Sequence, residues 1–241
     1  MSTTTQTQAI LSSGPSDSST YTPGSNWTHT TISVPTGLAP GDVLVEMCAT
    51  GICHTDLTIT SPPYFSSPRI VGHEGSGYVK AIGSGVKKDL KVGDPVLLSF
   101  DHCGQCESCG DGHPAYCSQF MGLNIPCIPD VFQSAHGKEG IAGKCFGQSS
   151  FAGLSAVKEA CVLNARDLVR SKEELQLFAP LGCGIQTGAG AVLNIAKPGK
   201  KDRVVVLGLG GVGLSAIAVS AACWIKLISI CCCWIFLLGH C

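Results

Sequence analysis

Short apolar runs separated by turn-forming residues dominate the chain between residues 40 and 100. The segments DVLVEMCAT (42–50), GYVKAIG (77–83) and DPVLLSF (94–100) carry the β-branched and apolar residues typical of strands. Glycine and proline interrupt them, for example at Pro40-Gly41 and at Gly93. This pattern predicts a compact β-rich domain with a barrel-like arrangement of strands.

The pattern changes twice further along the chain. The stretch from 101 to about 147 is rich in loop-forming residues and long for an unstructured loop, so something other than hydrophobic packing has to hold it. Residues 171–196 are helical in composition, and RVVVLG (203–208) has the continuous apolar character of a buried parallel strand. We therefore predict a mixed α/β chain, with a β-rich domain over 32–178 and a second domain beginning at 179.

The first 31 residues differ from the rest of the chain in composition. Serine and threonine dominate them, and Asp17 is their only charged residue. This composition predicts a disordered polar lead over 1–31. The first lysine or arginine of the chain is Arg69, so there is no basic segment of the kind found in signal or transit peptides, and we expect a cytoplasmic protein.

Charge and hydropathy limit the partners that the chain can have. The formal net charge is −1, which gives no electrostatic reason to expect binding to nucleic acid or anionic lipid. Residues 204–225 carry no charge and are long enough to span a membrane. The glycines between Gly208 and Gly213 favour a buried strand and turn over a membrane anchor, so we expect no membrane partner.

Fifteen cysteines without a signal peptide favour metal ligation or free thiols over a disulfide framework. The segment CGQCESCGDGHPAYC has the spacing C-x2-C-x2-C-x7-C, which is typical of a closed tetrahedral zinc site. An iron–sulfur cluster is the weaker alternative, because that pattern requires a fourth cysteine after three residues, followed by proline. We predict a structural zinc lobe over 101–118 with four ligands: Cys103, Cys106, Cys109 and Cys117.

A second set of ligands is dispersed along the chain. Cys53, His73 and Cys183 together supply two thiolates and one imidazole, the set that leaves a catalytic zinc with an open position. Such an ion acts as a Lewis acid on an alcohol or carbonyl oxygen. Asp56 is placed to accept the second ring N–H of His73 and to fix its tautomer, although a carboxylate in a turn or helix cap is the alternative interpretation.

Five motifs occur in order at suitable separations: GICHTD, GHEGSGYVKAIGSGV, GDPVLLSFDHCGQCESCGDGHPAYC, APLGCGIQTGAGAVLN and VVVLGLGGVG. From about Pro40 to Ala222 the chain resembles the zinc-dependent medium-chain alcohol dehydrogenases, and FGQSSFA with APLGCGIQTGAGAVLN is most similar to their aryl (benzyl) alcohol dehydrogenase branch. The resemblance implies a GroES-like catalytic domain followed by a Rossmann cofactor domain. It also implies two zinc ions per chain, NAD or NADP as cofactor, a small alcohol or aldehyde as substrate, and a homo-oligomer.

The resemblance also implies roles for individual residues. Thr55 matches the hydroxyl residue that passes the substrate proton outward, and Glu74 matches a carboxylate lying near the zinc. His54 stands where the family often has a basic residue facing the cofactor pyrophosphate, whereas Thr58 replaces a histidine that ends the proton relay in many members. Zinc-free quinone reductases of the same superfamily are a weaker alternative, because they would not need Cys53, His73 and Cys183 together.

A glycine-rich turn follows the strand at 203–208 and precedes an alanine-rich helical run, which is the context of a dinucleotide-binding site. We expect the cofactor to bind at Gly208, Gly210, Gly211, Val212 and Gly213. No Asp or Glu occurs after Asp202, although an acidic residue about 20 positions after the glycines normally binds the ribose. We therefore predict that 179–241 is a truncated Rossmann domain with an aberrant tail from about 223. A catalytically inactive, zinc-binding remnant of such an enzyme is the alternative function.

Overall fold

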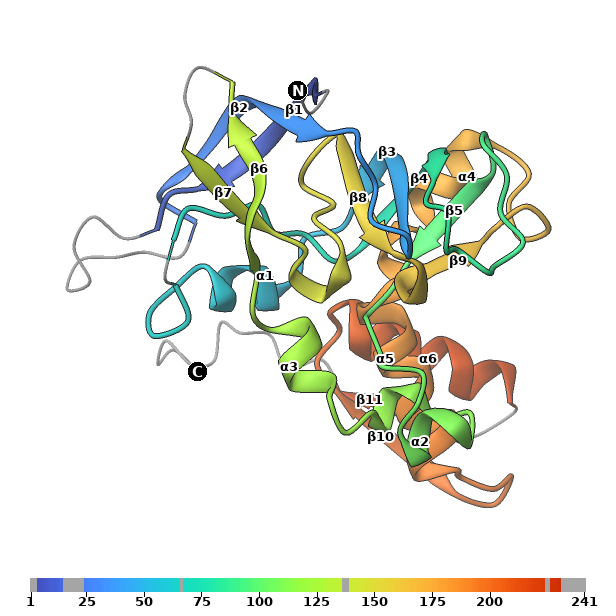
Figure 1. Cartoon of the computed structure of the whole chain (residues 1–241). Helices are drawn as coiled ribbons and strands as arrows, with labels where there is room; N and C mark the ends of the chain where they lie inside the picture. The colour runs from blue at the N-terminus through green and yellow to red at the C-terminus, as the bar shows by residue number, and fades with distance from the viewer. Residues whose placement is uncertain (1–3, 15–23, 66, 136–138, 224–225, 231–241) are drawn as a thin grey trace. The chain divides into compact units, whose positions relative to one another are not determined.

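The computed structural model describes residues 4–14, 24–65, 67–135, 139–223 and 226–230 (Figure 1). The chain forms two compact units, Met1–Gly182 and Cys183–Cys241. The second unit thus begins at Cys183, a few residues beyond the expected boundary after residue 178.

Two antiparallel sheets form the first unit (Figure 1). The four-stranded sheet has the order β1-β2-β6-β7, with β1 at Thr4–Ser12, β2 at Trp27–Pro35, β6 at Ile128–Ser134 and β7 at Gly140–Gly143. The five-stranded sheet has the order β8-β3-β4-β5-β9, with β8 at Leu154–Lys158, β3 at Asp42–Thr50, β4 at Gly75–Ile82, β5 at Pro95–Leu98 and β9 at Val162–Asn164. The strands predicted near 42–50, 77–83 and 94–100 are β3, β4 and β5.

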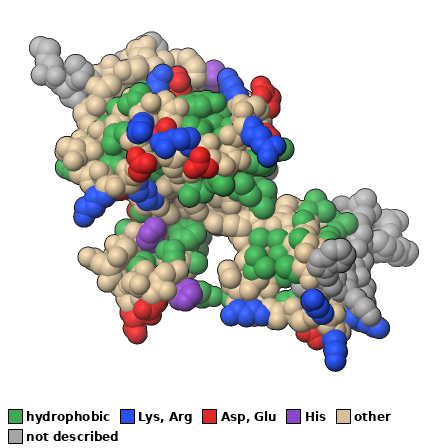
Figure 2. All heavy atoms as spheres, turned by 90° about the vertical axis from the view of Figure 1, so that its right-hand side faces the viewer, with side chains coloured by type: hydrophobic (Ala, Val, Ile, Leu, Met, Phe, Trp, Pro, Cys, Tyr) green, Lys and Arg blue, Asp and Glu red, His purple; other side chains and the backbone are tan. Residues whose placement is uncertain are grey.

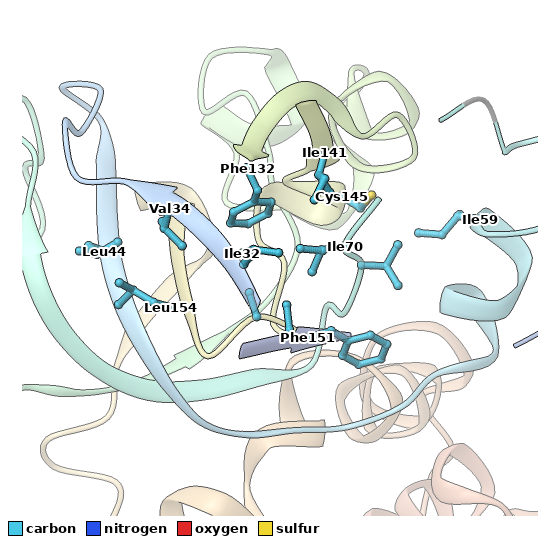
Figure 3. Close-up of a cluster of buried hydrophobic side chains, with 13 residues drawn as sticks. Ile32, Val34, Leu44, Ile59, Ile70, Phe132, Ile141, Cys145, Phe151 and Leu154 are labelled. Atoms are coloured by element: carbon cyan, nitrogen blue, oxygen red, sulfur yellow. The ribbon is translucent and has the colours of Figure 1, made fainter. Parts of the chain in front are cut away.

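Strand β3 lies between two hydrophobic cores. Val43 and Val45 pack with the side chains of β4, β5, β8 and β9 on one face of the sheet. Leu44 points to the other face and joins the cluster between the two sheets, where Ile32, Phe132 and other labelled residues converge (Figure 3). Because successive side chains of a strand alternate between faces, one short apolar run serves both cores.

Short helices connect the strands of the first unit. The α-helices are α1 (His54–Ile59), α2 (Glu107–Gly110), α3 (Phe120–Asn124) and α4 (Lys172–Leu177). Single 3₁₀ turns lie at η1 (Pro114–Tyr116), η2 (Cys145–Gly147), η3 (Glu159–Cys161) and η4 (Ala179–Gly182). Ser171 caps α4 by accepting a hydrogen bond from the backbone N–H of Glu174, which explains why the helical segment starts there.

The second unit has the start of a parallel α/β arrangement. Strand β10 (Arg203–Leu207) pairs in parallel with β11 (Lys226–Ile230), and α6 (Gly211–Ala222) connects them. Helix α5 (Gly184–Gly190) and the π-helical turn η5 (Ala191–Ala196) precede β10. Helix α5 packs on α6, because Gly188 lies so close to the carbonyl of Val212 that a Cβ would approach its oxygen to 2.0 Å.

The prediction of a disordered polar lead over 1–31 is wrong for the segments that form β1 and β2. These strands pair along their whole length, from Thr4 opposite Pro35 to Ser12 opposite Trp27. Threonine is polar but β-branched and is favoured in strands, so its abundance near the N-terminus is compatible with strands as well as with disorder. Residues 1–3 and 15–23 of the predicted lead lie outside the described residues.

The structure also corrects the interpretation of the cysteines as ligands or free thiols. Cys127, just before β6, forms a disulfide with Cys145, which follows β7. Cys145 is fully buried in the cluster between the sheets (Figure 3). The pair is not apparent from the sequence because its two members are 18 residues apart and match no ligand spacing.

Replacing Cys127 with serine is expected to destabilise the first unit. Loss of a cross-link that closes a loop of this length costs about 3 kcal/mol, mainly through the entropy of the unfolded chain. Urea unfolding monitored by far-UV circular dichroism measures the effect. A dithiol reductant should shift the wild-type midpoint similarly and should not shift that of Cys127→Ser; equal midpoints for oxidised wild type and variant would contradict the prediction.

Basic and acidic side chains are intermixed on the face of the molecule in Figure 2. Charged side chains of the first unit also pair: Lys80 Nζ lies 3.1 Å from Glu46 Oε2, and Arg166 Nη2 lies 2.6 Å from Asp94 Oδ2. Such pairs neutralise charge locally.

Candidate functional site

Asp56 connects the start of α1 to the segment that carries His73. Its side chain is fully buried, and its Oδ2 accepts a hydrogen bond from the backbone N–H of Cys53 at 3.0 Å. Its Oδ1 accepts the N–H of Gly72 at 3.0 Å and lies 2.9 Å from Nδ1 of His73. Gly72 adopts a φ of +95°, and a Cβ there would meet Phe151, so this close approach requires glycine.

The imidazole of His73 is 2% exposed, and its two nitrogens differ in environment. Nδ1 contacts Asp56, whereas Nε2 is buried with no hydrogen-bond partner among the described residues. Potential ligand atoms of His73, Cys53 and Glu74 lie within 4.8 Å of one another. A buried ring nitrogen without a hydrogen-bond partner, on a histidine that lies beside a thiol and a carboxylate, is what a metal-binding histidine would show.

Electrostatics favour a positive charge at this place. Burial opposes protonation of His73, but its interactions with Asp56 and Cys53 outweigh burial and raise the pKa of the ring to about 9. The same negative groups that stabilise the imidazolium would stabilise a bound cation, which would have to displace the proton.

Glu74 is buried beside these ligands. Its backbone carbonyl accepts the N–H of Gly51 at 2.9 Å, and a Cβ on Gly51 would lie 1.9 Å from the carboxylate oxygen Oε2. The absence of a side chain at residue 51 therefore gives the Glu74 carboxylate its space.

Two residues that the sequence did not single out support His73. The ring of Phe146 stacks on the imidazole, with ring centroids 4.5 Å apart and an interplanar angle of 24°. The fully buried Gln148 donates a hydrogen bond from Nε2 to the carbonyl of His73 at 2.9 Å. Both residues belong to the motif FGQSSFA, from which we inferred only a family resemblance. The single glutamine among small residues of this motif could have indicated a buried polar role.

Helix α1 carries the remaining residues expected near the ligands. Thr55 Oγ1 lies 3.6 Å from the sulfur of Cys53, and His54 is exposed at the first position of the helix. The hydroxyl of Thr58 donates to the carbonyl of His54 at 3.1 Å, so it serves the helix backbone.

Cys183 is the first residue of the second unit and the N-cap of α5. The residue before it, Gly182, is held within the first unit. Its carbonyl accepts the hydroxyl of Ser99 at 3.0 Å, and a Cβ at residue 182 would lie 1.8 Å from the carbonyl oxygen of Leu98. The backbone of Gly182, the residue bonded to Cys183, is therefore fixed by contacts within the first unit.

The four cysteines of the predicted lobe come together. Their sulfur atoms all lie within 4.8 Å of one another, and those of Cys103 and Cys109 are 3.9 Å apart. Backbone N–H groups point at the sulfurs, as at Cys106, whose N–H donates to Cys103 Sγ at 3.3 Å. Hydrogen bonds from backbone N–H groups, that of Ser118 first, lower the pKa of the Cys106 thiol to about 6, which favours the metal-binding thiolate.

Asn124, which no sequence pattern indicated, connects the lobe to helix α3 through hydrogen bonds to Asp101. It is fully buried in α3, and its Oδ1 accepts the N–H of Asp101 at 2.8 Å. Its Nδ2 donates to the carbonyls of Asp101 at 2.9 Å and Phe120 at 2.8 Å. The lobe is thus held by polar contacts around the cysteines, as its sparse hydrophobic content requires.

The glycine-rich turn lies between β10 and α6, where the sequence predicted it. Gly208 has a φ of +90°, and a Cβ on Gly213 would lie 2.0 Å from the Gly208 carbonyl oxygen. Gly210 is the N-cap of α6 and Gly211 its first residue, and a Cβ at either would meet no atom within 4 Å. Backbone N–H groups at the start of a helix with open space before them suit an anion such as pyrophosphate.

Comparison with known proteins decides the family. The sequence pattern of the alcohol dehydrogenase GroES-like domain matches residues 39–174. The chain belongs to this alcohol dehydrogenase family. The predicted fold class, a GroES-like β-rich domain in a mixed α/β chain, is confirmed.

Relatives within the family share about a third or more of the aligned residues. Geraniol dehydrogenase of Castellaniella defragrans is 41% identical over 189 residues, which cover 77% of this chain and 48% of the relative. S-(hydroxymethyl)glutathione dehydrogenase of Paracoccus denitrificans is 36% identical over 189 residues, covering 75% and 48%. The chain thus spans about half the length of these family members.

Solved structures of the family have the same fold. An alcohol dehydrogenase zinc-binding domain protein from Burkholderia ambifaria has a TM-score of 0.82 at 34% identity, covering 94% of this chain and 59% of that one. Benzyl alcohol dehydrogenase from Acinetobacter calcoaceticus has a TM-score of 0.78 at 35% identity, covering 93% and 58%. Among the residues described here, no helix has both the length and the hydropathy needed to cross a membrane.

Proposed function

We propose that this protein is a zinc-dependent, NAD(P)-linked alcohol dehydrogenase that oxidises primary alcohols, aromatic ones among them, to aldehydes. The observation that carries the proposal is the environment of His73: Asp56 contacts Nδ1, and Nε2 is buried close to Cys53 without a hydrogen-bond partner among the described residues. The names of similar proteins, geraniol dehydrogenase and benzyl alcohol dehydrogenase, support an alcohol as substrate.

Two zinc ions suit the donor sets. Cys53, His73 and Cys183 would hold one ion, and Cys103, Cys106, Cys109 and Cys117 would hold the other. The four thiolates form a closed site, whereas two thiolates and an imidazole leave one position open. An ion at the open site supplies a Lewis acid for the substrate oxygen.

The residues around the open site have distinct tasks in this proposal. Asp56 keeps the ring proton of His73 on Nδ1, so that Nε2 presents its lone pair. The hydroxyl of Thr55 carries the proton released by the alcohol outward. Glu74 adds a negative charge close to the ligands, which favours a cation there.

The cofactor site would use the turn at the start of α6. The residues are Gly208, Gly210, Gly211, Val212 and Gly213, whose backbone N–H groups would bind the pyrophosphate. His54, exposed at the first position of α1, stands where the family often has a basic residue facing the cofactor pyrophosphate. The assembly formed by the protein would be a homo-oligomer.

The test combines metal analysis with activity measurements on benzyl alcohol and geraniol, each with NAD and with NADP. We expect two zinc ions per chain in the wild type and one in His73→Ala, together with loss of alcohol oxidation in that variant. His102→Ala is the matched control, because His102 lies outside both ligand sets, and it should retain both ions. A wild-type protein with one zinc ion or none would contradict the proposal.

A metal-binding protein without dehydrogenase activity is the second candidate. One observation favours it: the sequence has no Asp or Glu after Asp202, so the carboxylate that normally binds the cofactor ribose is missing. In that case the chain would hold zinc but would bind the nicotinamide cofactor only weakly. Titration with NADH, followed by its fluorescence, distinguishes the two candidates, because tight stoichiometric binding excludes the second.

A further inference from the structure

The side-chain amide of Gln148 makes three hydrogen bonds to the backbone of the first unit. Nε2 donates one hydrogen bond to the carbonyl of His73 and another to the carbonyl of Ser99, both at 2.9 Å. Oε1 accepts the backbone N–H of Gly75 at 3.3 Å. A side chain with no exposed surface that satisfies two backbone carbonyls and one backbone N–H is expensive to replace.

Both carbonyls are connected to proposed metal ligands, one directly and one through a further hydrogen bond. His73 is itself a ligand in the proposed open site. The hydroxyl of Ser99 donates to the carbonyl of Gly182 at 3.0 Å, and Gly182 is bonded directly to Cys183. Gln148 therefore links the backbone of one ligand to the segment from which another departs.

The loop that presents Gln148 is itself fixed at several points. Lys144 is nearly buried and pairs with the carboxylate of Asp42. The next residue, Cys145, forms the disulfide with Cys127. The backbone at Gly147 passes so close to Cys161 that a Cβ would lie 2.4 Å from its sulfur. These contacts hold the loop from which Gln148 reaches both carbonyls.

Resting on the proposed function, we propose that Gln148 is a positioning residue for the open zinc site. Through its two donated hydrogen bonds it sets the separation between the backbone of His73 and that of Ser99, whose hydroxyl in turn donates to the carbonyl of Gly182, the residue before Cys183. The role requires two donors on one planar group, because both partners are carbonyl oxygens. Glutamate would place a carboxylate against them, and methionine would fill the space with no donor.

Cadmium-substituted protein provides the test, because ¹¹³Cd NMR gives a separate resonance for each bound ion. In Gln148→Met we expect the resonance of the Cys53–His73–Cys183 site to shift or broaden and that of the four-cysteine site to stay unchanged. We also expect zinc affinity, measured by chelator competition, to fall about 10–100-fold at that one site. Ser99→Ala, which removes the hydroxyl that donates to the Gly182 carbonyl, should shift the same resonance and covers the case in which Gln148→Met does not fold.

Gln176→Met is the matched control. Gln176 is exposed, and its Nε2 also donates to a backbone carbonyl, that of Cys48 at 3.2 Å, so the substitution removes one bond of the same kind away from the ligands. It should leave both resonances and both affinities unchanged. Two wild-type resonances that persist unshifted in Gln148→Met, or in Ser99→Ala if the former does not fold, would overturn the role of Gln148 alone. A single wild-type resonance, that of the four-cysteine site, would overturn the proposed function and this inference with it.

Discussion

Replacing Asp56 with alanine is expected to lower the free energy of unfolding by about 3–5 kcal/mol, because it removes one partner of a buried charged pair. The substitution leaves the N–H groups of Cys53 and Gly72 and the Nδ1 of His73 without their acceptor. Zinc affinity at the proposed open site should also fall about 10–100-fold, since the ring of His73 loses the contact that fixes its tautomer.

Urea unfolding of the metal-free protein and zinc analysis after chelator challenge measure these two effects separately. Asp89→Ala is the control, because Asp89 is a mostly exposed carboxylate 3.8 Å from Arg166, and exposed pairs contribute at most about 1 kcal/mol. A variant Asp56→Ala that unfolds at the wild-type urea concentration and keeps both zinc ions would show that the Asp56–His73 contact matters little.

Replacing Cys109 with alanine is expected to remove one zinc ion per chain and to unfold the lobe over 101–118. A structural zinc site of four thiolates contributes about 10–16 kcal/mol of binding energy, and that energy replaces the hydrophobic core that the lobe lacks. Helix α2 and the turn η1 lie within this lobe, and the structure buries none of their residues.

Zinc analysis combined with limited proteolysis tests this expectation. Cleavage within 101–118 should become rapid in Cys109→Ala and in chelator-treated wild type. Cys48→Ala removes a partly buried thiol outside both ligand sets and should retain two zinc ions and a resistant lobe. Slow cleavage of Cys109→Ala would mean that the polar contacts of Asn124 are sufficient to hold the lobe.

Features encoded by short-range pattern could be predicted from the sequence. The alternating apolar residues of 42–50 form a central strand, the cysteines of 103–117 lie together, and the glycines after β10 form the turn before α6. Asp56 was also expected to contact His73, because a carboxylate commonly accepts the second ring N–H of a metal-ligating histidine. Each of these depends on residues that are neighbours in sequence or on a known spacing.

Features that depend on distant partners could not be predicted. Gln148 and His73 are 75 residues apart, and nothing in either segment specifies that the amide meets that carbonyl. The pairing of β1 with β2 stabilises a Ser/Thr-rich segment whose composition alone suggests disorder. The Cys127–Cys145 disulfide and the Asn124 contacts likewise arise only once the fold brings their partners together.

The two-sided packing of β3 limits how the length of the chain can change. Val43 and Val45 face one core and Leu44 faces the other. Only Gly51 and Ile52 separate the end of the strand from Cys53. An insertion of one residue within 43–45 would exchange the side chains between the cores and move Cys53 about 3.3 Å along the strand direction. Single-residue insertions in β3 should therefore abolish zinc retention at the proposed open site, which a library of such insertions scored for zinc content would reveal.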